Sequence, residues 1–233
     1  MRPIVRGEKP VDSSDKTKTK QFKEYQEARG DLIAKLGQYC SYCEMKLDAS
    51  LAVEHVQPKS LYSALELDWG NFLLACTNCN STKGNQDVEL DNYYWPDLDN
   101  TFHTFVYLPG GLVQHNPNLN DQEEIKAKAT LKLTGLDKIS THDLKFSDRR
   151  QFNRREAWNI AIRSLNNLHK NNSSEMREQI VLTAIAEGYW SVWMTVFKDD
   201  PDMLKRFIEA FPGTCQDCFD SNCNPIPRPN GNL

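Results

Sequence analysis

The chain has 233 residues, a hydrophobic content of 39% and a formal net charge of −4, enough for one large domain or two small ones. No stretch reaches the roughly 18 consecutive apolar residues of a membrane helix, and residues 1–10 lack the apolar core of a signal peptide, so we expect a cytoplasmic protein. Seven cysteines in such a chain favour metal binding or free thiols, and an odd number cannot pair completely into disulfides.

The first predicted element is an extended segment that leads into a helix, together covering residues 1–38. Apolar residues recur at helical spacing over 15–37, and Gly37 stands where a C-terminal glycine belongs. Residues 39–90 then form a compact module. Its predicted elements are two short strands and a short helix: Leu51–Val56, Asn71–Ala75 and a helix that opens at Asn80.

The second half of the chain is predicted to be mainly helical. Residues 91–120 are irregular, and the turn signal Pro109-Gly110-Gly111 suggests a hairpin of Phe102–Leu108 against Leu112–Gln114. The helical region, 121–212, contains four predicted helices: 121–134, 147–170, 174–197 and 201–210. A tail rich in cysteine and proline, 213–233, follows. The expected fold class is therefore α+β, with a small module embedded in a mainly α-helical chain.

Charge is distributed unevenly along the sequence. Residues 1–40 carry nine basic and six acidic side chains, and residues 143–170 carry seven basic and three acidic ones, so the remainder carries −11. Because nucleic-acid binding needs a local positive surface rather than a positive total, the net charge does not exclude it. Solvated helix surfaces account for either basic segment equally well.

Two CxxC pairs bracket the module between 40 and 79. Zinc prefers four soft ligands in a tetrahedron, and two such pairs supply them. Four thiolates close the coordination sphere and leave no position for water, so the predicted zinc site is structural. The 32 residues between the two pairs exceed the 15–20 of a simple zinc ribbon, so the insert must itself be folded. The predicted ligands are Cys40, Cys43, Cys76 and Cys79.

An acid–histidine pair, Glu54-His55, lies inside this insert. Adjacent residues on a strand point to opposite faces, so the two side chains can reach one site only near a turn or a distorted strand end. Pro58 would help to end the strand. Asn71 and Asn80 follow at intervals of 16 and 9 residues.

These residues resemble the HNH endonucleases, whose ββα-metal motif has an acid–histidine pair, an Asn in the loop and a His or Asn opening the helix. The resemblance implies that His55 is the general base and that Asn71 braces the loop. It implies that Glu54 and Asn80 hold one catalytic cation. An asparagine at the third position favours Mg²⁺ or Mn²⁺, because its ligand atom is an oxygen. Lys83 and Lys59 are the expected nucleic-acid contacts.

A narrower resemblance covers mainly residues 1–90, including the knuckle CSYCE and the segment VEHVQPKS. It is to the HNH subunits of Septu-type antiphage systems, which are also found with retrons. This implies a defence role and an ATPase partner subunit (PtuA-like) in a hetero-oligomer, with a retron RNA or DNA element as a further component. DNA is the favoured substrate, and RNA, including tRNA, is compatible with the same chemistry.

Other features leave alternatives open. Cys215, Cys218 and Cys223 either form a second zinc site with a distant fourth ligand or remain free thiols. Two arginine pairs, 149–150 and 154–155, bind nucleic acid or an acidic partner, or pair with carboxylates. Four histidines are expected to be structural or exposed: His103, His115, His142 and His169. The competing function is a non-catalytic zinc-binding adaptor, which would need only the cysteines.

Overall fold

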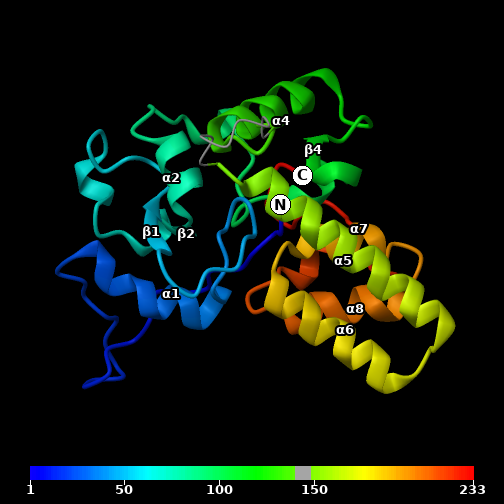
Figure 1. Cartoon of the computed structure of the whole chain (residues 1–233). Coiled ribbons are helices and arrows are strands. Elements are labelled where there is room, and N and C mark those ends of the chain that lie inside the picture. Colours follow the sequence, from blue (N-terminus) through cyan, green and yellow to red (C-terminus); the bar gives the residue numbers. More distant parts are fainter. Residues whose placement is uncertain (140–147) are drawn as a thin grey trace.

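A computed structural model describes residues 1–139 and 148–233 (Figure 1). A small unit formed by α1, β1, β2 and α2 lies on one side, and the helices α5 to α8 lie on the other. The chain is therefore α+β with a mainly helical remainder, as predicted. One hydrophobic core cluster includes buried residues from both sides, from Leu32 of α1 to Phe207 of α8. Within the described ranges, no helix is both long and apolar enough to cross a membrane.

The N-terminal helix is shorter than predicted. A 3-10 turn, η1 (Tyr25–Ala28), leads into α1 (Arg29–Leu36), which ends at Gly37. Residues 15–24 are not helical. Asp12 and Asp15 accept hydrogen bonds from the backbone two residues on, and such local bonds compete with helix formation.

The strand pair of the module is an antiparallel hairpin of β1 (Ala52–His55) and β2 (Phe72–Ala75), in which Glu54 pairs with Leu73 and His55 with Phe72. Asn71 closes a 3-10 turn, η3 (Trp69–Asn71), and so lies just before the strand that was expected to include it. The helix α2 (Thr77–Lys83) begins three residues earlier than predicted, because Cys76 serves as its N-cap through a sulfur that accepts from the Cys79 N–H.

The second hairpin follows as β3 (Phe105–Leu108) and β4 (Leu112–His115), joined by the 3-10 turn η5 (Pro109–Gly111). The predicted strand began too early. Thr101–Thr104 forms a helical turn, α3, because the Asn100 side chain caps it by accepting from two backbone N–H groups. Three further 3-10 turns are η2 (Ser63–Leu65), η4 (Leu90–Asn92) and η6 (Gln216–Cys218).

Two helices of the second half match their predicted bounds and two differ. The matching helices are α4 (Asp121–Thr134) and α8 (Pro201–Ala210). The next, α5 (Arg150–Lys170), starts three residues later than predicted; residue 147, and with it His142, lies outside the described residues. The long helix expected over 174–197 is two helices, α6 (Ser174–Glu187) and α7 (Trp190–Val196).

The break between α6 and α7 is a tertiary effect. Gly188 and Tyr189 have positive φ values of 76° and 55°, and the Tyr189 N–H donates to the Glu44 carbonyl at 2.9 Å. A Cβ on Gly188 would lie 2.7 Å from that same carbonyl oxygen. The Glu44 carboxylate, buried, accepts from the Ser191 N–H at 2.8 Å. The first cysteine knuckle is thus joined directly to the start of α7.

Candidate catalytic cleft and metal centre

The four cysteines of the two CxxC pairs converge on one buried point. Their sulfur atoms all lie within 4.8 Å of one another, and Cys43 Sγ lies 3.7 Å from Cys76 Sγ. A tetrahedral site with Zn–S bonds of about 2.3 Å has sulfur–sulfur edges of about 3.8 Å. The donor set and its spacing therefore fit a structural zinc ion, with Cys40 and Cys79 as the other two ligands.

Local backbone geometry explains how the first knuckle forms. Cys40 donates its N–H to the Met45 carbonyl, and the Glu44 N–H returns to the Cys40 carbonyl at 2.9 Å. Glu44 has a φ of 65°, which turns the chain tightly behind Cys43. The Ser41 N–H donates to the Leu74 carbonyl of β2 at 2.7 Å. The bond from Ser41 attaches the cysteine cluster to the hairpin that carries Glu54 and His55.

A cleft of about 170 Å³ opens beside the cysteine cluster. It brings together three predicted catalytic residues and one predicted nucleic-acid contact, from β1, from the loop after it and from α2. Its lining residues are Tyr25, Val53, Glu54, His55, Pro58, Lys59, Asn80, Gly84 and Asn85. Glu54 and His55 both reach it because they are the last two residues of β1, where the strand gives way to the loop.

His55 is held in one orientation by its surroundings. Its Nε2 lies 3.0 Å from the Glu66 carbonyl oxygen. Because a carbonyl only accepts, Nε2 carries the proton and the neutral ring keeps its lone pair on Nδ1. Tyr25 and Phe72 contact the ring edge-to-face, with centroids 4.8 and 5.3 Å away. Burial lowers the pKa of His55, so the ring is neutral at physiological pH.

Glu54 is buried against Lys83 of α2. Lys83 Nζ lies 2.9 Å from Glu54 Oε1 and donates to the His55 carbonyl at 2.8 Å. Burial raises the pKa of the Glu54 carboxyl, and the Lys83 charge opposes that rise. Only 1% of the Lys83 side chain is exposed. The structure thus corrects the expected phosphate contact: the ammonium lies beneath the cleft, where it orients Glu54 and the strand end.

Asn71 fixes the loop that follows His55. Its Oδ1 accepts from the Gln57 N–H at 2.8 Å, and its Nδ2 donates to the Gln57 carbonyl at 2.9 Å and to the Leu65 carbonyl at 3.3 Å. Its own carbonyl accepts from the Val56 N–H. The side chain is buried and is not among the residues that line the cleft. Asn71 therefore acts on the cleft by holding the backbone.

Asn80 and Lys59 stand at the accessible side of the cleft. Asn80 is half-buried; its backbone N–H donates to the Cys76 carbonyl, and within the part of the chain that the structure describes its side-chain amide makes no hydrogen bond. Lys59 is 43% exposed; it pairs with Glu66 Oε1 at 2.7 Å, and its ammonium lies 4.5 Å from the centre of the Tyr25 ring. The hydrogen bond to Glu66 raises the pKa of Lys59.

Two contributors to the site did not emerge from the sequence. Tyr25 appeared as one apolar position of a helix, although it lines the cleft and packs on His55. Glu66 supplies the carbonyl that sets the His55 tautomer, and a backbone carbonyl leaves no mark in the residue type. Only the aromatic identity of Tyr25, which lies 15 residues before Cys40, could have drawn attention to it.

The third cysteine group does not form a comparable site. Cys215 and Cys218 are buried and Cys223 is half-buried, and the Cys223 sulfur points to the Pro201 carbonyl at 3.9 Å. Within residues 1–139 and 148–233, the four-cysteine cluster is the group whose ligand atoms gather closely enough for a metal. Among the histidines, His115 lies 3.7 Å from a Glu124 carboxylate oxygen, a partner that the sequence did not indicate.

Comparison with known proteins finds matches over part of the chain. Residues 40–86 match the model of the HNH endonucleases. Over 63 residues the chain is 38% identical to the Septu protein PtuB of Bacillus thuringiensis, a match that covers 26% of this chain and 24% of PtuB. The chain thus carries an HNH domain and resembles PtuB across it, and the matched segment spans about a quarter of that relative.

Proposed function

We propose that this HNH-domain protein is a metal-dependent endonuclease that hydrolyses phosphodiester bonds in nucleic acid. DNA is the favoured substrate, and RNA, including tRNA, is the alternative. The observation that carries the proposal is the cleft beside the cysteine cluster, which is lined by Glu54, His55 and Asn80 together. An adaptor that used only the cysteines would have no need of this arrangement.

In this proposal His55 is the general base. Its Nε2–H is committed to the Glu66 carbonyl, so the Nδ1 lone pair is the atom that takes a proton from the attacking water. Burial keeps the ring neutral, which is the form that can accept that proton. Asn71 keeps the following loop, and therefore the ring, in place through its bonds to Gln57 and Leu65.

Glu54 and Asn80 would hold the catalytic cation. A carboxylate and an amide oxygen are hard donors, which suits Mg²⁺ or Mn²⁺ better than zinc. When bound, such a cation stabilises charge on the phosphate and on the departing oxygen. Lys83 holds Glu54 from beneath, and Lys59 stands at the exposed rim, where its ammonium can meet a phosphate of the substrate.

The resemblance to PtuB supports an assembly as well as a chemistry. We propose that the chain is the effector nuclease of an antiphage system, controlled by a PtuA-like ATPase subunit in a hetero-oligomer, with a retron RNA or DNA element as a further component. One cleft of this kind cuts one strand. Cleavage of both strands would therefore require two copies of the chain within the assembly.

A cleavage assay tests the proposal. Wild type and His55→Ala are incubated with plasmid DNA and with tRNA, with Mg²⁺ or Mn²⁺, alone and with the co-purified partner. Wild type should cleave and His55→Ala should not. His115→Ala is the matched control, since His115 pairs with Glu124 away from the cleft, and it should cleave like wild type. Equal cleavage by wild type and His55→Ala would refute the mechanism, and no cleavage in any arm would favour the adaptor.

A further inference from the structure

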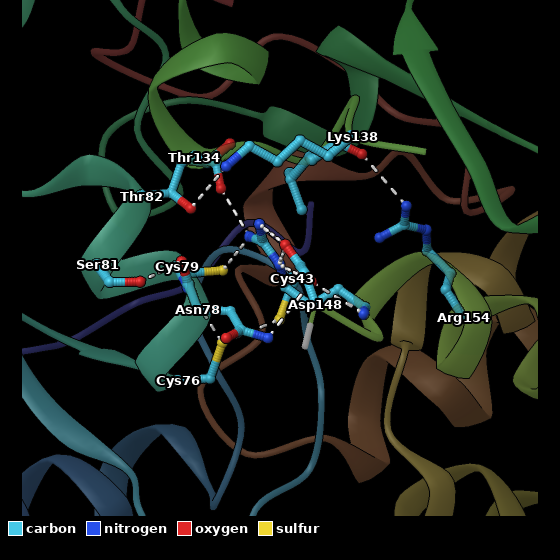
Figure 2. Close-up of polar contacts among 12 residues, drawn as sticks. Cys43, Cys76, Asn78, Cys79, Ser81, Thr82, Thr134, Lys138, Asp148 and Arg154 are labelled. Atoms are coloured by element: carbon cyan, nitrogen blue, oxygen red, sulfur yellow. Dashed lines mark hydrogen bonds and ion pairs between the residues drawn. The ribbon is translucent and has the colours of Figure 1, made fainter. Parts of the chain in front are cut away.

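Arg150, the first residue of α5, lies against the cysteine cluster. Its side chain is only 3% exposed, and its Nη1 lies 3.0 Å from the sulfur of Cys79. The same Nη1 donates to the Thr134 carbonyl, the last of α4, at 2.7 Å. Figure 2 shows the surroundings of this contact, with Cys79, Thr134 and Asp148 drawn together around one point. From the sequence, this arginine was expected to bind nucleic acid or an acidic partner, or to pair with a carboxylate; contact with a cysteine ligand was not foreseen.

The guanidinium is fixed by several neighbours. Asp148 accepts from Nε at 3.0 Å and from Nη2 at 2.7 Å, and the Asn78 amide donates to the same carboxylate at 3.3 Å. Gly135 has a φ of 66°, and a Cβ there would lie 3.0 Å from Nη2, so the glycine leaves room for the arginine. A planar fork with five donors can satisfy a carboxylate on one edge and a sulfur and carbonyl on the other.

A charged donor matters at this sulfur because of the charge on a four-thiolate zinc site. Four thiolates and one Zn²⁺ carry a formal charge of −2, buried beneath the surface. A hydrogen bond from a cation draws electron density from a thiolate, which makes that sulfur a weaker nucleophile. Outer partners of metal ligands commonly determine how firmly the metal is held.

We infer that Arg150 is an outer-sphere partner of the zinc site, which donates to the Cys79 thiolate and protects it from electrophiles. Because Asn80 follows Cys79 directly, the same contact also fixes the start of α2, which carries the proposed cation ligand. Arg150 of α5 thus contacts the zinc ligand Cys79, and Cys79 is bonded to Asn80, which lines the cleft. This inference requires zinc at the four cysteines but not nuclease activity.

The test measures zinc loss rather than cleavage. Zinc-loaded protein is treated with N-ethylmaleimide in the presence of a colorimetric zinc chelator. The Cys79 sulfur adds to the maleimide double bond, the neighbouring carbon takes a proton from water, and Zn²⁺ passes to the chelator. Arg150→Met should release zinc about tenfold faster than wild type. Mass spectrometry of partly reacted Arg150→Met should find Cys79 labelled first among the four zinc ligands. Label on Cys215, Cys218 and Cys223, which lie outside the zinc site, is counted separately.

Arg154→Met is the matched control. Arg154 is also a buried arginine of α5, but it donates to the carbonyls of Gly111 and Leu136 rather than to sulfur. Its variant should lose zinc at nearly the wild-type rate. The inference is overturned if Arg150→Met keeps the wild-type rate, if Arg154→Met is equally fast, or if label spreads evenly over the four cysteines.

If Arg150→Met does not fold, the lysine variants at positions 150 and 154 test the inference instead. Arg150→Lys keeps a buried cation but loses the fork, so it should release zinc several-fold faster than Arg154→Lys. Equal rates for these two lysine variants would refute the role of Arg150.

Discussion

Replacing Lys83 by methionine tests whether the buried ion pair beneath the cleft supports the fold. Methionine has a similar volume, so the change removes the charge without opening a large cavity. It leaves the Glu54 carboxylate, only 5% exposed, without its partner at 2.9 Å. Removing one member of a buried pair typically costs about 3–5 kcal/mol, because the other charge remains buried. That is a large part of the roughly 5–15 kcal/mol by which domains are stable.

The assay is urea unfolding of zinc-loaded protein without added Mg²⁺ or Mn²⁺, followed by tryptophan fluorescence and circular dichroism. Trp69 is buried near the hairpin and reports on this part of the molecule. Lys83→Met should lower the free energy of unfolding by about 3–5 kcal/mol. Lys16→Met, at an exposed lysine, should change it by no more than about 0.5 kcal/mol.

The double variant Glu54→Gln/Lys83→Met identifies the cause. With both charges removed, no unpaired charge stays buried, so the double variant should be more stable than Lys83→Met by about 2 kcal/mol or more. A Lys83→Met loss below about 1 kcal/mol would refute the reasoning. So would a double variant that is no more stable than the single one, since the loss would then arise from packing or from the lost hydrogen bond to the His55 carbonyl.

Three further predictions concern the base, the loop and the second hairpin. Burial lowers the pKa of His55 below its ordinary 6.5. The cleavage kcat/KM should therefore be constant near neutral pH and fall as the pH is lowered, with a midpoint below pH 6.5. A midpoint above pH 6.5 would contradict a buried neutral base. Asn71→Ala leaves the Gln57 N–H and carbonyl unpaired, which should cost about 1–3 kcal/mol in urea unfolding and lower kcat; unchanged stability would argue against the brace. Gly111→Ala should lower the free energy of unfolding by at least about 2 kcal/mol, because the new Cβ would lie 2.7 Å from the Arg155 backbone nitrogen in α5. Gly110→Ala, with open space around its Cβ, should lower it less. Equal losses in the two variants would show that the clash is not the cause.

Helix bounds could be predicted where the signals are local. α4 matches because Asn120 and Glu123 form a capping box at its start and Gly135 ends it. α8 matches because Asp200 caps it and Pro201 occupies its first position. The break between α6 and α7 could not be predicted in the same way. It depends on a hydrogen bond from Tyr189 to Glu44, which lies 145 positions earlier in the chain.

In the cleft, too, some features could be predicted from the sequence and others depended on tertiary packing. Glu54, His55, Asn71 and Asn80 could be named because their residue types and spacing follow a motif. Lys83 was expected to contact nucleic acid, because a lysine near a helix end is usually solvated, but the structure buries it. Whether it is buried depends on a carboxylate on β1 that lies 2.9 Å away.

The sequence by itself determined which atoms can bind metal and which ring can accept a proton, since ligand chemistry belongs to the residue type. It therefore predicted the four cysteines as zinc ligands, while the roles of the acid–histidine pair and the two asparagines followed from the resemblance to HNH endonucleases. Only the tertiary structure decided which charges are buried and what they face. Lys83 lies against Glu54 and Arg150 against Cys79 because distant segments pack together, and burial and pairing are properties of that packing.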